Sequence, residues 1–364
     1  MQDKRILFVH PSLGLGGAEK IIAFLANSFS NEYNVSFLTL KESHETLKLN
    51  DNINVICRPS YSEIPIVGKQ MVSGLRSLYK MGWIIKDVVK SVAADIVVCF
   101  DLRVLLAMNV VRNNAKILFS ERADPYENPK YWQILLKQFY RRVSMIVFQT
   151  EEARLFYGNV VKDKSEIIPN PALLRTDANI VRNSACIEEY IFAAGRLQRR
   201  KGFDLLIYAF IEIGDKFPDV KLKLYGDGEE MELLLGIIRD HGYEDRIEIL
   251  PPVNGVIEKN VNARLFVIPS RSEGIPNILI EAMVAGIPSV ATDCSPGGAK
   301  LISDKGKYCL LARNDDVESL SEKITFALSH PQIMEEYAVK AKSSMNRFDK
   351  DLIANSWKSV LGRM

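Results

Sequence analysis

The sequence predicts an α/β protein built from two Rossmann-like, doubly wound domains. Short β-rich runs alternate with longer helical patterns from the first residues onward, which is typical of parallel sheets with crossover helices. The alternation pauses near the middle of the chain and then restarts. The chain has 364 residues. Because roughly 150 residues are usual for one domain, we expect two cores of similar size with a cleft between them.

The first domain is expected over residues 1–172. Its opening strand is the apolar run 6–9, and a helix from Ala18 to Ser28 follows. Later apolar runs continue the same sheet, at residues 35–40, 95–100, 116–120 and 145–149. The strand pattern stops from residue 163 onward, where the rigid Ile168-Pro169-Asn170-Pro171 precedes a polar stretch, and we place a linker at 173–187.

The second domain is expected over residues 188–346. Helical patterns separate its five apolar runs, which lie at 190–194, 220–225, 246–250, 265–268 and 289–292. Residues 347–364 form a C-terminal segment, and its helix, from Leu352 to Leu361, is expected to return to the first domain. The whole pattern is that of two doubly wound sheets in series.

Composition excludes several classes of protein. Hydrophobic residues make up 47% and charged residues 25% of the chain, as in soluble globular proteins. No apolar run approaches the roughly 18 residues that span a bilayer, and the first one is too short for a signal peptide. The five cysteines are scattered, without a Cys-x-x-Cys pair, which indicates a reducing compartment and no metal site. We therefore expect a cytoplasmic protein, or one peripheral on the inner face of the cell membrane.

Basic residues exceed acidic ones only in the first half of the chain. Residues 1–172 contain 22 Lys and Arg against 17 Asp and Glu, whereas the remainder contains 25 against 28. The excess favours an anionic partner of the first domain, although ordinary surface scatter would explain it as well. We expect no nucleic-acid partner.

A glycine-rich loop, residues 14–19, follows the first strand and opens a helix. Gly16 and Gly17 would let backbone N–H groups approach an anion at the helix N-terminus. Glu19 stands where the dinucleotide-binding fingerprint requires glycine, which argues against an NAD-dependent oxidoreductase. A tight strand-to-helix turn needs glycine without any ligand, so the loop alone leaves both interpretations open.

A second loop, Gly195 to Gly202, begins the same architecture in the second domain. Arg196 and Lys201 are spaced to reach one point from either end of a turn. A bidentate guanidinium and a compact ammonium would together neutralise a diphosphate leaving group. The alternative is a solvated basic turn.

A third segment, residues 272–282, follows a strand of the second domain. Pro276 suits the first turn of a helix and Gly286 its end. Asn277 and Glu281 share one side of that helix, and Glu273 precedes it. Backbone amides of residues 274–277 would meet an anion there, although a carboxylate at a helix start is often only a cap.

Together these segments resemble the donor site of glycosyltransferase family 4, which has the GT-B fold and retains anomeric configuration. The resemblance covers nearly the whole chain. It rests on Gly195-Arg196 with Lys201-Gly202, and on Glu273 and Glu281 separated by seven residues. Three further matches are the loop Gly16-Gly17-Ala18-Glu19, the interdomain Ile168-Pro169-Asn170 and the strand end Tyr225-Gly226-Asp227-Gly228.

The resemblance implies a role for each of these residues. Arg196 and Lys201 would hold the donor diphosphate, and Glu273 would contact the donor sugar. Glu281 would hydrogen-bond the ribose hydroxyls, and Leu250 would border the base. The remaining donor-binding residues that it implies are Gly16, Gly17, Gly195, Gly274, Ile275, Pro276 and Asn277.

The chain departs from the family after a strand of the first domain. Many relatives carry His there, whereas this sequence reads Ser120-Glu121-Arg122-Ala123-Asp124-Pro125, with Arg122 at the usual His position. Either Arg122, Glu121 or Asp124 would therefore engage the sugars.

The reaction that we predict is retaining, metal-independent transfer of a hexose or N-acetylhexosamine. The donor is a nucleotide-diphosphate sugar, by family default a UDP-sugar. The acceptor is a glycan, lipid-linked, in the biosynthesis of a surface polysaccharide or lipopolysaccharide. Arg, Lys and helix-terminal amides can stabilise the leaving diphosphate without a metal, and no cofactor is expected. Two alternatives are a nucleotide-sugar epimerase of GT-B fold and a non-catalytic nucleotide-sugar sensor.

Two stretches of the first domain suggest contact with an anionic membrane surface. Residues 69–90 interleave Lys69, Arg76, Lys80 and Lys86 with Leu75, Leu78, Tyr79 and Trp83. Residues 130–142 set Tyr131, Trp132, Leu135 and Phe139 beside Lys137 and Arg141. Both would be surface helices that dock reversibly, unless their apolar members pack into the core.

Overall fold

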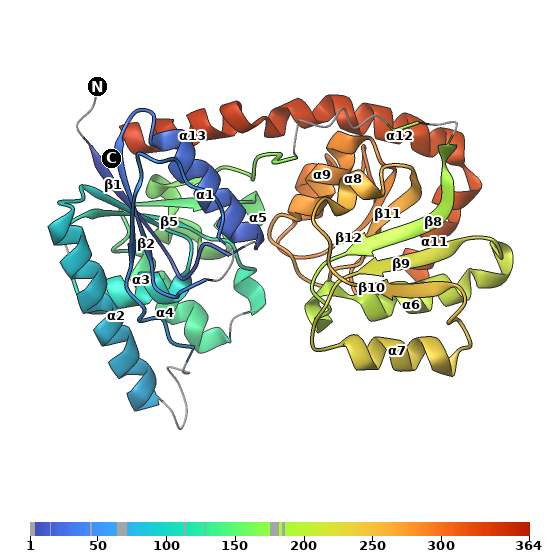
Figure 1. The fold of residues 1–364 in the computed structure, drawn as a ribbon, viewed down its shortest axis with the longest axis horizontal. Helices are drawn as coiled ribbons and strands as arrows, with labels where there is room; N and C mark the ends of the chain where they lie inside the picture. The colour runs from blue at the N-terminus through green and yellow to red at the C-terminus, as the bar shows by residue number, and fades with distance from the viewer. Residues whose placement is uncertain are drawn as a thin grey trace. The chain divides into compact units, whose positions relative to one another are not determined.

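The computed structural model describes residues 4–14, 16–43, 46–63, 71–112, 114–127, 129–174, 182–183 and 186–364. The chain divides into two compact units (Figure 1). Unit 1 consists of Met1–Asn170 and Asp351–Met364, and unit 2 consists of Pro171–Lys350. Most of the predicted linker, residues 173–187, lies outside the described residues.

Unit 1 contains a parallel seven-stranded sheet in the order β3-β2-β1-β4-β5-β6-β7. Its strands are β1 (Arg5–His10), β2 (Asn34–Thr39), β3 (Asn54–Cys57), β4 (Ile96–Cys99), β5 (Lys116–Ser120), β6 (Met145–Phe148) and β7 (Ser165–Ile167). The central strands are buried on both faces, as expected for a parallel sheet covered by helices on both sides.

The helices of unit 1 are α1 (Gly17–Phe29), α2 (Met71–Ser91), α3 (Leu102–Val110), α4 (Lys130–Tyr140), α5 (Glu151–Tyr157) and α13 (Lys350–Gly362). Alternate strand residues such as Leu7 and Val97 form one core with the inner sides of α2, α3 and α4. Gly82 lets α2 approach α3, because a Cβ there would lie 2.5 Å from the carbonyl oxygen of Ala107. The opposite face holds Phe8, whose ring stacks against Phe37 and contacts Phe29 of α1.

Unit 2 contains a parallel six-stranded sheet in the order β10-β9-β8-β11-β12-β13. Its strands are β8 (Glu188–Ala194), β9 (Lys221–Tyr225), β10 (Ile247–Leu250), β11 (Ala263–Ile268), β12 (Ser289–Asp293) and β13 (Leu310–Arg313). Its helices are α6 (Phe203–Glu212), α7 (Met231–Asp240), α8 (Val256–Lys259), α9 (Asn277–Ala285), α10 (Gly298–Ile302), α11 (Val317–Ser329) and α12 (Pro331–Ser344). Two apolar clusters, one on each face of the sheet, complete its core.

The C-terminal helix α13 lies in unit 1, although it follows unit 2 in the chain. Trp357 is buried there, and its ring centroid lies 5.8 Å from that of Phe100. Lys4 donates a hydrogen bond from Nζ to the carbonyl oxygen of Leu361, 3.0 Å away. Lys358 pairs with Glu32 of unit 1 at 2.5 Å.

One expectation about the strands is wrong. The strand pattern does not stop at residue 163, because β7, Ser165–Ile167, pairs with β6 and completes the first sheet. The prediction also omitted β3 and β13, which lie at the sheet edges.

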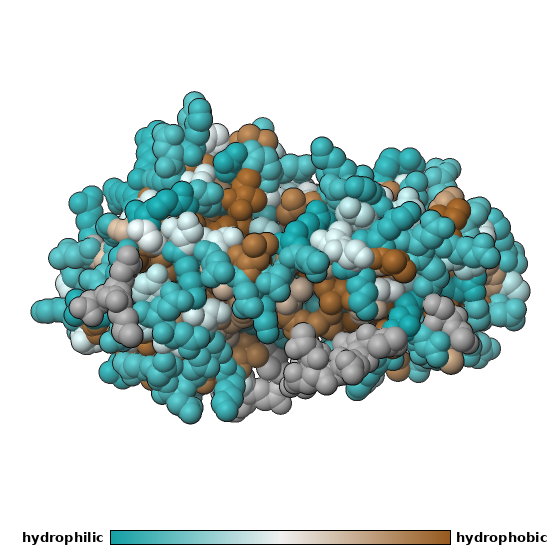
Figure 2. Space-filling model, turned by 90° about the horizontal axis from the view of Figure 1, so that it is seen from above, coloured by the Kyte–Doolittle hydropathy of each residue, from teal (hydrophilic) through white to brown (hydrophobic). Residues whose placement is uncertain are grey.

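No helix within the described residues is long and apolar enough to cross a bilayer. Figure 2 shows one face of the molecule, where hydrophilic side chains cover most of the surface.

Candidate functional site

The candidate site lies at the carboxyl edge of the sheet of unit 2. The strand order reverses direction between β8 and β11, which are hydrogen-bonded neighbours. In open α/β sheets, ligands bind outside the carboxyl ends of the strands at such a switch point. Two of the predicted segments leave the sheet there. The loop 195–202 follows β8, and the loop 269–276 follows β11.

A glycine allows these two loops to touch. Gly202 has φ +66°, and a Cβ built on it would lie 2.1 Å from the carbonyl oxygen of Pro269. The backbone N–H of Arg271 donates to the carbonyl oxygen of Arg200, 2.8 Å away. Only glycine permits both this left-handed conformation and this close approach.

Lys201 and Glu273 form an ion pair across the contact of the two loops, from Nζ to Oε2. Each side chain is 18% exposed, so the pair is largely shielded from water. Ser270 donates a hydrogen bond from Oγ to the same carboxylate oxygen, 3.1 Å away. The structure therefore brings together one basic and one acidic residue that the sequence assigned to the same site.

The loop 269–276 also contacts the turn after β12. The backbone N–H of Glu273 donates to the carbonyl oxygen of Ser295, 3.1 Å away. A Cβ on Gly298 would lie 1.7 Å from the carbonyl oxygen of Gly274, so glycine is required for this packing. Burial, with the nearby charge of Glu273, raises the pKa of the Cys294 thiol in this turn to about 12, so it stays protonated.

The helix α9 begins directly after this loop. Pro276 is its N-cap residue, and Ile275 and Pro276 are buried. Asn277 and Glu281 lie one turn apart on the helix and are partly buried. Asn277 and Glu281, two of the predicted donor-binding residues, therefore lie on the helix that directly follows the loop of Glu273.

The remaining predicted residues of unit 2 lie on neighbouring strand ends. Gly195 follows β8 directly and donates its N–H to the carbonyl oxygen of Tyr225. Arg196 is exposed. Leu250 is partly buried at the end of β10, which is separated from β8 by β9, and its carbonyl oxygen accepts a hydrogen bond from Gly226. Leu250 thus ends a strand two places from β8 in the sheet, whereas Gly195 and Arg196 directly follow β8.

In unit 1, Gly16 and Gly17 stand at the start of α1, as expected. Gly16 is the N-cap residue, and its carbonyl oxygen accepts a hydrogen bond from Lys20. A Cβ on Gly16 would lie 2.3 Å from the Oε2 atom of Glu19, a flexible side chain that a larger residue would displace. Leu15 of this loop lies outside the described residues.

The three candidate residues after β5 differ in what they contact. Glu121 is buried, and its carboxylate accepts hydrogen bonds from Tyr140, from Tyr157 and from the backbone N–H groups of Arg122 and Ala123. Burial raises the pKa of Glu121, although these hydrogen bonds oppose the shift. Its oxygens are therefore occupied by groups of unit 1 itself.

Arg122 and Asp124 have partners of other kinds. Arg122 stacks over the ring of Phe100, 4.0 Å from its centroid, and donates from Nη1 to the side-chain oxygen of Asn170. Asp124 is buried and accepts a hydrogen bond from the backbone N–H of Tyr126 at 2.9 Å. No local sequence pattern indicated the aromatic partners of Glu121 and Arg122, because Tyr140, Tyr157 and Phe100 lie far from these residues along the chain.

Among the described residues, no group of three or more His, Cys, Asp or Glu side chains is placed to hold a metal ion.

Comparison with known proteins shows similarity to glycosyltransferases. Residues 182–344, which contain all of the candidate site of unit 2, match the model of the glycosyl transferases group 1. An uncharacterized glycosyltransferase of Haemophilus influenzae is 25% identical over 98% of this chain and 100% of its own. The N-acetylgalactosamine-N,N'-diacetylbacillosaminyl-diphospho-undecaprenol 4-alpha-N-acetylgalactosaminyltransferase of Campylobacter jejuni is 24% identical over 98% of this chain and 99% of its own.

Among solved structures, Anabaena HepE in complex with UDP and glucose superposes with a TM-score of 0.77 at 18% identity. The superposition covers 99% of this chain and 100% of HepE. The two parallel sheets with flanking helices are those of the GT-B fold that the sequence predicted.

Proposed function

Residues 182–344 belong to the glycosyl transferases group 1, and on this premise we propose that the chain is a retaining, metal-independent hexosyltransferase. It moves a hexose or N-acetylhexosamine from a UDP-sugar to a glycan acceptor that is linked to a lipid. The product is a precursor of a surface polysaccharide or lipopolysaccharide. Two similar proteins support these choices: HepE is in complex with UDP and glucose, and the Campylobacter enzyme acts on a diphospho-undecaprenol-linked glycan.

The observation that carries the proposal is the Lys201–Glu273 pair at the switch point of unit 2. A shielded ammonium there can stabilise negative charge that develops on a leaving diphosphate. A carboxylate beside it can accept hydrogen bonds from the hydroxyls of a donor sugar. The start of α9 adds backbone N–H groups and the positive end of a helix dipole.

The chemistry that we propose is front-face displacement. The bond between the anomeric carbon and the diphosphate oxygen breaks, and the acceptor oxygen forms a new bond to that carbon on the same face. The acceptor proton passes to the departing phosphate oxygen. Lys201 and Arg196 stabilise the diphosphate, and Glu273 orients the sugar without forming a covalent bond to it.

Binding of nucleotides by the purified protein tests this function before any acceptor is known. We expect calorimetry to show that UDP binds, with GDP, ADP and NAD as competitors of lower affinity. Transfer from a UDP-sugar to a lipid-linked glycan should then persist in excess EDTA. Loss of turnover on chelation, with recovery on addition of Mn²⁺ or Mg²⁺, would show that the electrostatic account is wrong.

The two alternatives give other results in the same assays. An epimerase would convert the donor sugar without an acceptor. A sensor would bind UDP-sugar yet transfer nothing to any acceptor.

We further propose that unit 1 rests on the cytoplasmic face of an anionic membrane through α2. Val72, Leu75, Tyr79 and Trp83 are exposed and follow one another at helical spacing along this helix. Arg76, Lys80 and Lys90 are exposed on the same helix, and Lys86 lies 4.8 Å from the ring centroid of Trp83. Interfacial aromatics together with basic side chains favour binding to anionic lipid, at about 1 kcal/mol for each basic residue.

Only part of the stretch 69–90 is available to contact a membrane, because one side of α2 packs into the core. Leu78, Met81 and Ile85 are buried against the sheet, so Leu78 is unavailable, whereas the stripe of Val72, Leu75, Tyr79 and Trp83 faces outward. Lys69 lies outside the described residues. In the second stretch, α4 exposes Ile134 and Leu135 but buries Leu136 and Tyr140, so it offers a smaller apolar surface.

A further inference from the structure

Arg271 lies at the centre of the contacts that fix the two loops of the candidate site. It precedes Glu273 by two residues in the loop after β11. Its Nη1 and Nη2 atoms donate to the two carboxylate oxygens of Asp204, at 2.7 and 2.8 Å. This fork-to-fork geometry holds both groups in one orientation. Asp204 lies in the first turn of α6, directly after the loop that carries Lys201.

The same guanidinium reaches two more segments. Its Nη1 atom also donates to the carbonyl oxygen of Arg199, at 2.9 Å, and its Nε atom donates to Asp315, at 2.6 Å. Asn314 donates a hydrogen bond to the carbonyl oxygen of Arg271, 3.0 Å away. One residue thus links the loop after β11 with the turn before α6 and with the turn after β13.

The Arg271–Asp204 pair is largely shielded from water. Arg271 and Asp204 side chains are each 17% exposed. Burial alone would raise the pKa of Asp204, but the hydrogen bonds and the charge of Arg271 outweigh it, so the pKa falls below its ordinary value. The pair therefore stays charged at neutral pH, and a lysine could not reproduce its planar fork.

We propose that Arg271, held by Asp204, is a positioning residue that sets the separation of Lys201 and Glu273 and thereby the affinity of the site for a nucleotide diphosphate. The inference rests on the proposed function. Arg271 itself need not touch the donor. It fixes the backbone at Arg199 and Arg200 on one side and at residue 271 on the other, immediately next to the two residues that we assign to binding.

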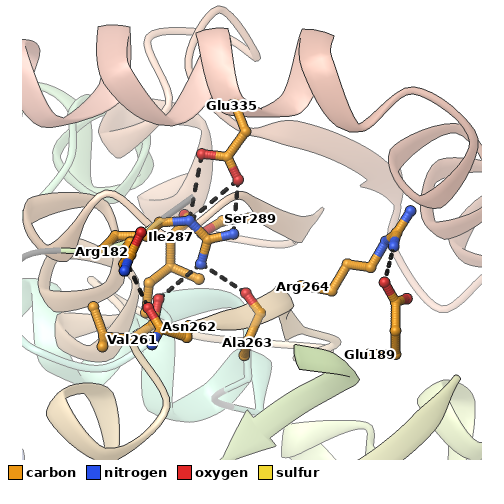
Figure 3. Close-up of polar contacts among 10 residues, drawn as sticks. Arg182, Glu189, Val261, Asn262, Ala263, Arg264, Ile287, Ser289 and Glu335 are labelled. Carbon is orange, nitrogen blue, oxygen red and sulfur yellow. Dashed lines mark hydrogen bonds and ion pairs between the residues drawn. The ribbon is translucent and has the colours of Figure 1, made fainter. Parts of the chain in front are cut away.

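A second arginine of unit 2 provides a matched control. Arg182 forms an equally elaborate set of contacts, with Glu335 of α12 and with the carbonyl oxygens of Val261 and Ala263 (Figure 3). Its partners lie at the start of β11 and on α12, and none belongs to the loops of the candidate site. A loss of its fork would affect stability without altering the Lys201–Glu273 geometry.

The experiment compares Arg271→Lys with Arg182→Lys in the full chain. Both replacements keep the charge and remove the fork. We expect Arg271→Lys to weaken UDP binding, measured by calorimetry, and to lower kcat/KM by roughly 10- to 100-fold, because small displacements at a site have effects of this size. Arg182→Lys should bind UDP as the wild type does. Thermal melting of both variants reports whether unit 2 remains folded.

A double variant separates positioning from general stability. If Arg271 acts through Lys201, adding Arg271→Lys to Lys201→Ala should weaken UDP binding little further, because the two changes remove the same interaction. Full additivity of the two losses would overturn the proposal, as would unchanged UDP affinity in Arg271→Lys. Failure of the wild-type protein to bind UDP or any other nucleotide diphosphate would instead reject the proposed function and this role together.

Discussion

At the switch point of unit 2, Lys201 and Glu273 compensate each other's charge. Each alone would be a partly desolvated charge, and each reduces that cost for the other. A donor diphosphate and its sugar would offer both residues new partners of the right polarity. The pair could therefore serve the fold, donor binding or both, and the activity of variants that lack either residue distinguishes these roles.

We expect Arg196→Ala, Lys201→Ala, Glu273→Ala and Glu281→Ala each to lower turnover by roughly 10² or more while the fold remains intact. The reason is the loss of charge or hydrogen bonding to the leaving diphosphate, the donor sugar or the ribose. Steady-state transfer assays measure the effect. Arg200→Ala is the control, because this exposed side chain lies in the same turn without a predicted role. Near-normal activity of both Lys201→Ala and Glu273→Ala would remove the mechanism from these residues.

Some individual residues of the candidate site could be predicted from the sequence, and others could not. The motifs that contain Lys201 and Glu273 placed both residues in one predicted site, and their side chains do form an ion pair, whereas their roles toward a donor remain a prediction. Glu121 could not be separated from Arg122 and Asp124. Its partners Tyr140 and Tyr157 are 19 and 36 residues away in the chain, so no local pattern revealed that its carboxylate was already bound.

Strands and helices were predictable to the extent that they are buried. The central strands β1, β4 and β8 are apolar runs enclosed by helices, and all three were predicted. β3 is largely exposed, and β7 has only three residues. Both owe their place to pairing with a neighbouring strand rather than to their own sequence, which is why periodicity did not show them.

The exposed stripe of α2 supports a prediction about this element. We expect the protein to co-sediment with vesicles that contain anionic phospholipid, and less so at high salt, because screening weakens the attraction of its basic residues. Replacing Tyr79 and Trp83 by Ser should reduce the bound fraction. These side chains are 53% and 48% exposed, so the core should tolerate the change.

Leu233→Ser is the matched control for the vesicle assay. Leu233 is also 53% exposed, but it lies on α7 of unit 2. This variant should bind vesicles as the wild type does. Equal recovery of the wild-type protein in the supernatant with and without anionic vesicles would exclude membrane docking and favour an acceptor in solution.

At the scale of the whole molecule, the sequence predicted two cores because its β–α alternation restarts after a pause. The structure adds that the chain passes between the units twice, near residue 170 and near residue 350. The second passage allows α13 to bury Trp357 in unit 1, together with Ile353, Val360 and Leu361.

We expect Trp357→Ala to destabilise unit 1 by about 3–5 kcal/mol, the usual effect of removing a large buried aromatic side chain. All three tryptophans of the chain, Trp83, Trp132 and Trp357, lie in unit 1. Urea unfolding followed by tryptophan fluorescence therefore reports on unit 1 alone, and a lower midpoint is expected. Leu352→Ala, at an exposed position of the same helix, should leave the midpoint near that of the wild type. Equal midpoints for wild type and Trp357→Ala would mean that α13 does not stabilise this unit.

The return of α13 has a consequence for how the protein is made. The strands of unit 1 leave the ribosome before unit 2, but the helix that covers Phe100 leaves it after unit 2. Unit 2 is complete in sequence before α13 has been translated, and it can fold while unit 1 still has an uncovered apolar face. During biosynthesis, unit 1 is therefore started before unit 2 but completed after it.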